Sequence, residues 1–421
     1  MMAQDRYRQY LAALRTDFVK LAKLEFLNPD GGVAFTLDND AKKRRSRAFL
    51  QKGSISCNLQ NGKRRQAEVT LVNTGGEFEY AVNHIWFGQQ IRLSEGLLLP
   101  DGSEYYIPQG IFEIENPGES VRPEGNTVTY RLTDKWARLD GSLGGKLEGA
   151  YSVTAGTNIF QAMRSLLLLD RYTMENNGNH PIDPVAPLFT SYYNGKTQTL
   201  TDGSLAYLTD APYDFLSSDS GTMADVLLGL AEMLAAWIGY NQNGRLVVAP
   251  SQDDIVDSTK PVLWPFRTGD RELLGLDYGM NLPEVYNDII VVGATSDSGA
   301  TARGRAQNRD LSSDTCVSRI GLKTNRLSMP NYYSDEICEA YAEWTLKRAS
   351  VACKSVNVSC TQMFHIVENQ IITVQRPDKP GNPVERHVVQ GFTRPLEQVG
   401  SMTINAISTA DLPMATIIKD S

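Results

Sequence analysis

Short segments of alternating apolar and polar residues, separated by turn residues, recur from Val33 to about Gly141. Side chains alternate between the two faces of a β-strand, so this period of two predicts strands. The segments lie at 54–59, 67–71, 78–82, 90–93, 111–114 and 127–132. Turn markers such as Asn-Gly and Asp-Gly separate them, at 61–62, 75–76, 101–102, 116–118 and 124–126. Many short strands with regular turns predict a closed or nearly closed β-barrel, which leaves few exposed strand edges.

A helical pattern precedes this block. Apolar residues recur at steps of three and four between Tyr10 and Leu24, which predicts a helix over about 4–26. The turn residues Asn28-Pro-Asp-Gly-Gly32 are expected to end it.

Helical patterns return after the block, first at 159–167. Thr222 and Asp225 then have the spacing of a capping box, in which each side chain satisfies a free amide at a helix start. An apolar stripe follows as far as Trp237, and Gly239 is expected to end this helix.

A second strand-rich block follows and is interrupted by a helix expected at 334–349. Its strands are expected at 288–293, 355–360, 371–374, 387–389 and 402–407. We therefore predict a second β-domain with a helical insertion.

These patterns predict an α+β, β-rich multidomain protein. Its length of 421 residues corresponds to about three domains at roughly 150 residues each. The predicted parts are an N-terminal helix at 1–28, a first β-barrel at 29–150, a mixed α/β domain at 151–270, a second β-domain at 271–298 and 353–412, and an inserted helical or loop subdomain at 299–352.

The sequence predicts synthesis in a cytoplasm and no membrane-spanning segment. Basic residues recur through the first 26 residues with no uninterrupted apolar stretch after them, unlike a secretory signal. No later run approaches the roughly 20 apolar residues that cross a bilayer. The most apolar candidate, 223–240, contains Asp225 and Glu232.

The cysteines are few, odd in number and never spaced as CxxC, which argues against a disulfide framework or a zinc ribbon. They are Cys57, Cys316, Cys338, Cys353 and Cys360. Cys360 continues the alternation of Val356 and Val358, so we expect it to be a small core residue.

Charge is divided unevenly along the chain. Residues 1–65 carry 14 Lys and Arg against 6 Asp and Glu, whereas the remainder carries 27 against 43. Neutralising phosphates requires clustered cations, so the acidic body disfavours a large nucleic-acid-binding surface. It is compatible with a narrow acidic passage through which DNA slides without binding.

The basic run from Lys42 to Arg47, echoed at 63–65, has three interpretations. It could contact nucleic acid or another anionic surface, dock an acidic neighbouring protein, or be a solvated loop between strands. The sequence leaves all three open.

Two segments resemble ligand-binding loops but lack the residues that such loops need. In the Gly-rich segment from Asp140 to Leu147, Asp stands where a phosphate loop has its first Gly, and Leu stands where it has Ser or Thr. We expect a turn there. Asp38-Asn-Asp40 begins like a calcium loop, but lysines follow where oxygen ligands belong.

No catalytic motif appears elsewhere. The histidines, His84, His180, His365 and His387, are scattered, and His365-Ile-Val-Glu368 has no second His one turn away. There is no GxSxG elbow, and no pair of carboxylates stands out for glycosidase chemistry. We therefore predict no enzymatic activity and no catalytic, cofactor-binding or metal-binding residues.

Five segments, taken in order, resemble the phage tail hub family. This family contains the baseplate hub of contractile tails and the N-terminal part of siphophage tail-associated lysins. The segments are GIFEIE at 110–115, VTYRLTDKWARLDG at 128–141, YSVTAGTNI at 151–159, VYNDIIVVG at 285–293 and RPLEQVGSMTI at 394–404. No single motif is specific to the family, so the resemblance depends on the order of the five segments along nearly the whole chain.

The resemblance implies a structural hub at the distal end of a phage or phage-like tail, in the virion. It implies a homotrimer with two tube-like β-barrels per subunit, the first at 29–150 and the second at 271–298 and 353–412. The six barrels of the trimer would form a pseudo-sixfold ring that continues the hexameric tail tube. The implied partners are a distal tail or tail tube protein, the tape measure protein, and a spike or fibre protein. DNA would pass through the channel without specific binding, and no cofactor is implied.

Two alternatives remain at this stage. A receptor- or carbohydrate-binding tail-tip protein would need exposed aromatic platforms, whereas Trp136, Trp237 and Trp344 lie in core-like patterns. A tail-associated cell-wall hydrolase would need a nucleophile, metal or acid motif.

Overall fold

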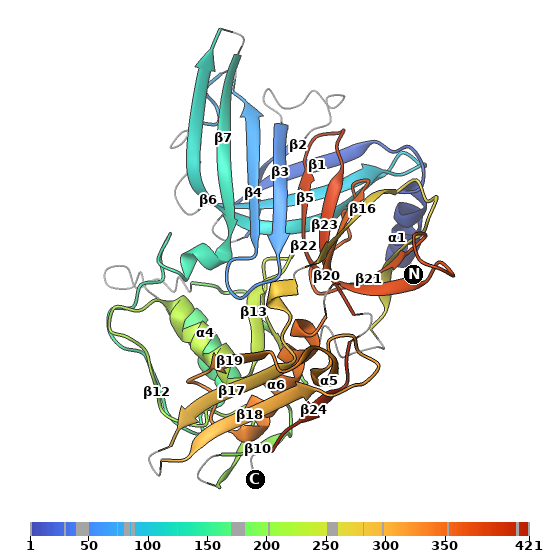
Figure 1. Cartoon of the computed structure of the whole chain (residues 1–421). Coiled ribbons are helices and arrows are strands. Elements are labelled where there is room, and N and C mark those ends of the chain that lie inside the picture. The colour runs from blue at the N-terminus through green and yellow to red at the C-terminus, as the bar shows by residue number, and fades with distance from the viewer. Residues whose placement is uncertain are drawn as a thin grey trace.

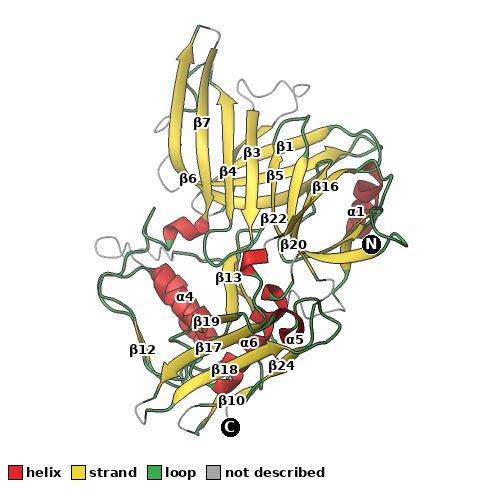
Figure 2. Cartoon of the chain, in the orientation of Figure 1, coloured by secondary structure: helices red, strands yellow, loops and turns green. Residues whose placement is uncertain are grey.

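The computed structural model describes residues 2–28, 31–38, 50–73, 75–79, 85, 89–123, 125–169, 182–200, 203–250, 260–280, 282–296, 299–351, 353–409 and 412–419. Strands dominate, and the few helices lie beside or below one large sheet (Figure 2). The α+β, β-rich multidomain class that the sequence predicts is confirmed.

The large sheet has 13 strands and contains both strand-rich blocks (Figure 1). The first block supplies β1 (Lys20–Leu27), β2 (Val33–Asp38), β3 (Leu50–Asn58), β4 (Arg65–Val72), β5 (Gln90–Leu98), β6 (Glu104–Arg122) and β7 (Gly125–Asp134). The second block supplies β15 (Val262–Phe266), β16 (Leu273–Met280), β20 (Cys353–Cys360), β21 (Ile371–Gln375), β22 (Val384–Pro395) and β23 (Met402–Ser408). The strand order is β16-β20-β23-β22-β3-β4-β7-β6-β5-β1-β2, with β21 beside β22 and β15 beside β21.

The same five-strand unit occurs twice in this sheet. Unit one is β3-β4-β7-β6-β5 and unit two is β16-β20-β23-β22-β21, and every neighbouring pair within both is antiparallel. The strands of each unit also follow one another in the same order along the chain. The chain therefore contains two copies of one β topology, side by side.

A corner strand bends each unit. Residues 104–113 of β6 pair with β5, and residues 112–122 pair with β7 across a bulge between Ile114 and Asn116. In unit two, β22 passes in the same way from β21 to β23, with a bulge between Val389 and Gly391. Bulges bend and twist strands, which lets β1 and β5 cross behind the upright β3, β4 and β7 (Figure 1).

The predicted N-terminal helix at 1–28 is too long. Helix α1 covers only Met2–Ala13, and the predicted second half of the helix is strand β1. Of the residues in the predicted helical stripe, Tyr10 and Leu11 lie in α1, whereas Leu21 and Leu24 lie in β1. In this strand Ala22, Leu24 and Phe26 face the core and alternate with more exposed neighbours. Pairing of β1 with both β2 and β5 outweighs the local helical pattern.

Two local predictions in the first block are also wrong. Phe78 and Glu79 lie in a turn rather than a strand, and the rest of that predicted strand lies outside the described residues. Asn116-Pro-Gly118 does not end a strand, because β6 continues through it as paired backbone. The predicted strands at 54–59, 67–71, 90–93, 111–114 and 127–132 correspond to β3 to β7.

The mixed domain lies below the large sheet (Figure 1). Its elements are η1 (Lys135–Arg138), β8 (Ser152–Val153), α2 (Ile159–Leu167), β9 (Leu188–Phe189), β10 (Thr197–Thr199), β11 (Leu205–Tyr207), β12 (Phe215–Leu216), α4 (Met223–Met233), β13 (Ala236–Tyr240) and β14 (Leu246–Pro250). The Thr222–Asp225 capping box is confirmed. The helix ends before Trp237, however, because Ala235 adopts φ +47° and the chain turns into β13.

The insertion is larger than predicted and has its own sheet, in the order β19-β17-β18-β24. Its elements are η2 (Leu282–Glu284), β17 (Asp288–Thr295), β18 (Thr301–Asn308), α5 (Val317–Ile320), β19 (Thr324–Ser328) and α6 (Asp335–Ala349), and β24 (Ala415–Ile417), which follows the second strand-rich block, pairs with β18. The strand at 288–293, expected in the second barrel, is β17 and belongs here. Conversely, β15, expected in the mixed domain, pairs with β21 of the large sheet. The insertion enters between β16 and β20, where unit one has the short β3–β4 turn.

The mixed domain and the insertion pack against each other through aromatic rings. Tyr213 stacks on Tyr333 at 3.7 Å between ring centroids, and Trp237 meets Trp344 edge-on at 6.3 Å. No helix within the described ranges is long and apolar enough to span a bilayer.

Candidate functional site: the junction of the two units

The two units meet where β3 pairs with β22. Residues Asn58 to Ser54 pair antiparallel with Gly391 to Pro395, so backbone hydrogen bonds run without interruption from one unit into the other. Beneath this pairing lies a set of buried charged and amide side chains, which we call the junction cluster. It consists of Lys20, Arg65, Glu95, Gln109, Gln362, Glu368 and Arg394.

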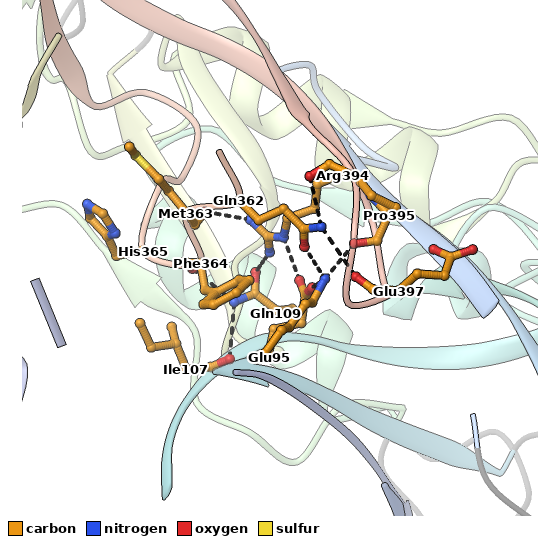
Figure 3. Close-up of polar contacts among 12 residues, drawn as sticks. Glu95, Ile107, Gln109, Gln362, Met363, Phe364, His365, Arg394, Pro395 and Glu397 are labelled. Carbon is orange, nitrogen blue, oxygen red and sulfur yellow. Dashed lines mark hydrogen bonds and ion pairs between the residues drawn. The ribbon is translucent and has the colours of Figure 1, made fainter. Parts of the chain in front are cut away.

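Arg394 connects unit two to unit one. Its Nε donates to Glu95 Oε2 at 2.5 Å, and its Nη1 donates to the Met363 carbonyl at 2.9 Å (Figure 3). Lys20 Nζ lies 2.9 Å from the other oxygen of Glu95. None of these three side chains is exposed. Burial lowers the pKa of the Lys20 amine, although Glu95 favours its charged form.

A second ion pair crosses in the opposite direction. Arg65 of unit one donates to Glu368, in the loop between β20 and β21 of unit two. Burial by itself raises the pKa of the Glu368 carboxyl, but Arg65 and Arg64 outweigh it and hold that pKa below its usual range. Each unit thus contributes one buried arginine that is neutralised by a glutamate from the other side.

Gln109 connects the two ion pairs. Its backbone carbonyl accepts from Arg65 Nη1 at 2.9 Å, while its side-chain oxygen accepts from Arg394 Nη2. Its amide nitrogen donates to the Phe364 carbonyl at 2.9 Å. Gln109 is the residue of β6 that bulges out of the pairing with β5, so the bulge presents its backbone and its side chain to the two arginines.

Helix α1 covers the cluster from one end. The hydroxyl of Tyr10 accepts from the Phe364 amide at 3.0 Å and hydrogen-bonds His365 Nδ1 at 3.0 Å. Burial, with help from the nearby Arg394, lowers the pKa of His365 to about 3. His365 is therefore neutral at ordinary pH and serves as a hydrogen-bonding core residue.

The cluster is suited to fixing geometry rather than to chemistry. Removing one partner of a buried ion pair leaves an uncompensated buried charge, which costs about 3–5 kcal/mol. Each arginine can keep its hydrogen bonds only while the two units hold one relative orientation. The junction cluster therefore sets the angle between the units.

The other face of the sheet at the junction is polar, and its side chains are exposed or half-buried except for Thr133, which is buried. A row of residues in cross-strand register runs over both units and consists of Gly275, Ser359, Thr403, Thr393, Ser56, Gln66 and Thr133. The charges beside it include Glu68 and Arg131, which pair at 3.4 Å. An open hollow of about 500 Å³ on this face is lined by Ser54, Ser56, Gln66, Glu68, Glu115 and Arg131, among others.

The residues that the sequence suggested for metal or phosphate binding contact other parts of the fold instead. His365 and Glu368 have separate partners, Tyr10 and Arg65. Gly145, in the phosphate-loop-like segment, adopts φ +83° in a turn, and a Cβ there would lie 2.5 Å from the Arg138 carbonyl oxygen. The described part of the chain holds no group of three His, Cys, Asp or Glu side chains that could bind a metal.

Other predicted features can be placed only in part. The basic run at 42–47, His84 and His180 lie outside the described residues. Cys57, Cys316, Cys338 and Cys360 are free and buried, and Cys360 faces the core from β20, as its alternation predicts.

The sequence carries a signal for most of the charged junction residues. Each charged residue of the cluster that lies in a strand is in phase with the buried side of that strand, whereas Glu368 lies in a loop. Lys20 is in phase with Ala22 and Leu24, and Arg394 is in phase with Phe392 and Leu396. A charge at an inward position predicts a buried ion pair, although it does not say which residue is the partner.

No family model matches the sequence, and no curated protein matches it. Solved structures do match. The tail protein from Neisseria meningitidis MC58 is 8% identical, with a TM-score of 0.59 over 94% of this chain and 98% of that one. The 43 kDa tail protein of prophage MuSo2 from Shewanella oneidensis is 11% identical, with a TM-score of 0.55 over 92% and 98%. Prophage tail protein gp18 from Listeria monocytogenes EGD-e is 7% identical, with a TM-score of 0.50 over 92% and 94%. At these identities the likeness shows the fold, and the predicted resemblance to phage tail proteins is confirmed at that level.

Proposed function

We propose that this chain, which has the fold of phage tail proteins, is a structural hub at the distal end of a phage or phage-like tail. In this role it joins the hexameric tail tube to a trimeric tip, spike or fibre. The observation that carries the proposal is the duplicated five-strand unit. A chain with two like units side by side lets three copies present six units, which matches a sixfold tube without a change of fold.

The junction cluster supports this role. A ring of six units closes only if neighbouring units keep a constant angle. Buried, reciprocal ion pairs at Arg394–Glu95 and Arg65–Glu368 restrict that angle within each chain. Each chain then behaves as one rigid third of a ring.

The polar face supports a channel. Its row of hydroxyl and amide side chains runs over both units and is close to electrically neutral. Since phosphate binding depends on clustered Lys and Arg, such a wall would let DNA slide past without specific binding. We assign this face to the bore through which the tape measure protein and then DNA pass.

A hub role accounts for these features better than the two alternatives. Trp136 and Trp344 are buried, and Trp237 packs against Trp344, so none of the three offers an open platform for a sugar. A cell-wall hydrolase would need an exposed acid, nucleophile or metal site. The junction cluster, the best-formed polar group in the described residues, is sealed from solvent by strands and α1. We therefore propose no enzymatic activity.

Electron cryomicroscopy of tails that contain the chain tests the location. The proposal expects density for the chain in a ring at the distal end, between the tube and the tip. Density along the tube, in the sheath or on peripheral fibres would overturn it.

A further inference from the structure

Several strand edges of the large sheet are unpaired in the described part of the chain, including those of β2 and β15, and two others have a counterpart in the junction within the chain. One is the outer edge of β16, at the end of the strand order. The other is the outer half of β6, residues 115–121, on the side where residues 104–113 pair with β5. Unpaired edges carry rows of amide and carbonyl groups that readily pair with another strand.

The junction within the chain indicates which strands these two edges would pair with. There, β3, the first strand of unit one, pairs with β22, the fourth strand of unit two. It uses the side of β22 that pairs with β21, because residues 387–388 pair with β21 and β23 at once, and residues 391–393 pair with β3 and β23 at once. Its counterpart would join the first strand of unit two, β16, to the fourth strand of unit one, β6. Figure 1 shows β6 and β16 on opposite sides of the sheet, so this contact is not made within one chain.

We propose that β16 of one copy pairs antiparallel with residues 115–121 of β6 in a second copy of this chain. The contact repeats the β3–β22 junction between molecules and joins copies head to tail. It rests on the proposed ring-forming function and names the surfaces that close the ring. Such a heterologous contact closes a ring when the rotation per copy divides a full turn.

The register follows from the junction within the chain. On β22, pairing with β3 begins at Gly391, three residues after pairing with β21 ends at Val388, and the last residue of β3 lies there. The same spacing on β6, where pairing with β5 ends at Glu113, sets Met280 near Asn116.

Alternation of faces then fixes the register to one residue, because a slip of one reverses every side chain. On β6, Asn116 and Gly118 lie on the polar face, opposite Arg131 and Thr129. On β16 the polar face carries Gly275, Asp277 and Gly279, opposite Ser359, Asn357 and Ser355. Matching polar to polar sets Gly118 opposite Asp277 and Val121 opposite Leu274.

This register also pairs two exposed apolar residues. Val121 is 79% exposed and Leu274 is 59% exposed in the single chain. Facing each other across the new pairing, they would cover one another. Pro117 is no obstacle, since Pro395 occupies a paired position in the junction that serves as the template.

Cross-linking tests the proposal. A short bismaleimide can bridge cross-strand neighbours, whose Cβ atoms lie roughly 5–8 Å apart. The background carries Cys353→Ser, and Cys57, Cys316, Cys338 and Cys360 are buried. A Val121→Cys/Leu274→Cys chain is expected to give covalent dimers and trimers, with yields at least ten times those of the matched control Val121→Cys/Leu311→Cys. Leu311, in the insertion, is 72% exposed.

Mixing the single variants tests polarity. Val121→Cys with Leu274→Cys should give dimers and nothing larger, whereas neither single variant should link to itself. Self-linking of either single variant, or equal yields from the control pair, would overturn the edge assignment. So would a failure of the Val121→Cys/Leu274→Cys chain to form cross-links at high protein concentration. A trimer by light scattering that fails to cross-link would overturn only this edge pairing, whereas absence of the chain from tail ends would overturn the proposed function.

Discussion

Arg394 of unit two and Glu95 of unit one form an ion pair of 2.5 Å in which neither side chain is exposed. The residues are 299 positions apart in sequence, yet they meet beneath the strand pairing that joins the units. Because the buried pair forms only when the two units have one relative orientation, it fixes the angle between them.

Arg394→Met should lower the free energy of unfolding by about 3–5 kcal/mol, because Glu95 would remain buried and charged beside Lys20 alone. Urea denaturation followed by tryptophan fluorescence would measure it. Arg131→Met is the matched control, since Arg131 is 68% exposed beside Glu68, and it should cost less than about 1 kcal/mol. Equal losses of unfolding free energy for the two variants would contradict a stabilising ion pair at the junction.

The Tyr10 hydroxyl should stabilise the folded chain through its two buried hydrogen bonds. Tyr10→Phe leaves the Phe364 amide and His365 without their partner and should cost about 1–3 kcal/mol. Tyr7→Phe, one turn away, keeps the ring that stacks on Tyr10 and should cost little. Limited proteolysis of the N-terminal helix would provide a second readout, with faster release expected only for Tyr10→Phe.

Stability should fall as the pH drops from about 6.5 to about 4, in part through His387. Burial lowers the pKa of this side chain to about 4, with Arg376 and Lys379 adding to the effect and Glu385 opposing it. A base with a lowered pKa in the folded state binds more protons when unfolded, so its contribution is complete above the unfolded value and lost toward the folded one. The loss should be on the order of 3 kcal/mol. His387→Gln should flatten the pH profile in this window, and an unchanged slope would refute the assignment.

A positive bore wall should bind DNA. Thr393→Lys with Asn405→Lys places two cations per chain on the polar face, where both side chains are exposed. Assembled rings of this variant should bind duplex DNA, with a log–log salt slope of roughly −5 if six lysines contact phosphates. Val384→Lys with Val399→Lys adds the same charge at exposed sites outside the row and should bind weakly. Equal binding by both variants, measured by fluorescence anisotropy, would argue against the bore assignment.

Alternation of residues predicted most strands of the large sheet because one face of each is buried. β3, β4 and β7 show this alternation, for example in Ala67, Val69 and Leu71. The prediction failed where a partner from elsewhere decides the structure. The apolar spacing around Leu21 and Leu24 suits a helix, yet β1 forms because β2 and β5 flank it. Likewise, Trp237 continues a helical stripe, but the chain turns at Ala235.

The candidate site was less predictable than the fold. Inward-facing charges such as Glu95 and Arg394 were visible as interruptions of an apolar face, but these two partners lie 299 positions apart in the sequence. Only the pairing of β3 with β22 brings them together. A shared Gln-Gly pair in the two corner strands, Gln109-Gly110 and Gln390-Gly391, agrees with a duplication but is too short to reveal one.

If one chain supplies two like units, three copies are enough to make a ring of six. Native mass spectrometry of the complex released from tail ends would count these copies. We expect a species with three copies of the 46.6 kDa chain. A complex with six copies, or with one, would contradict it.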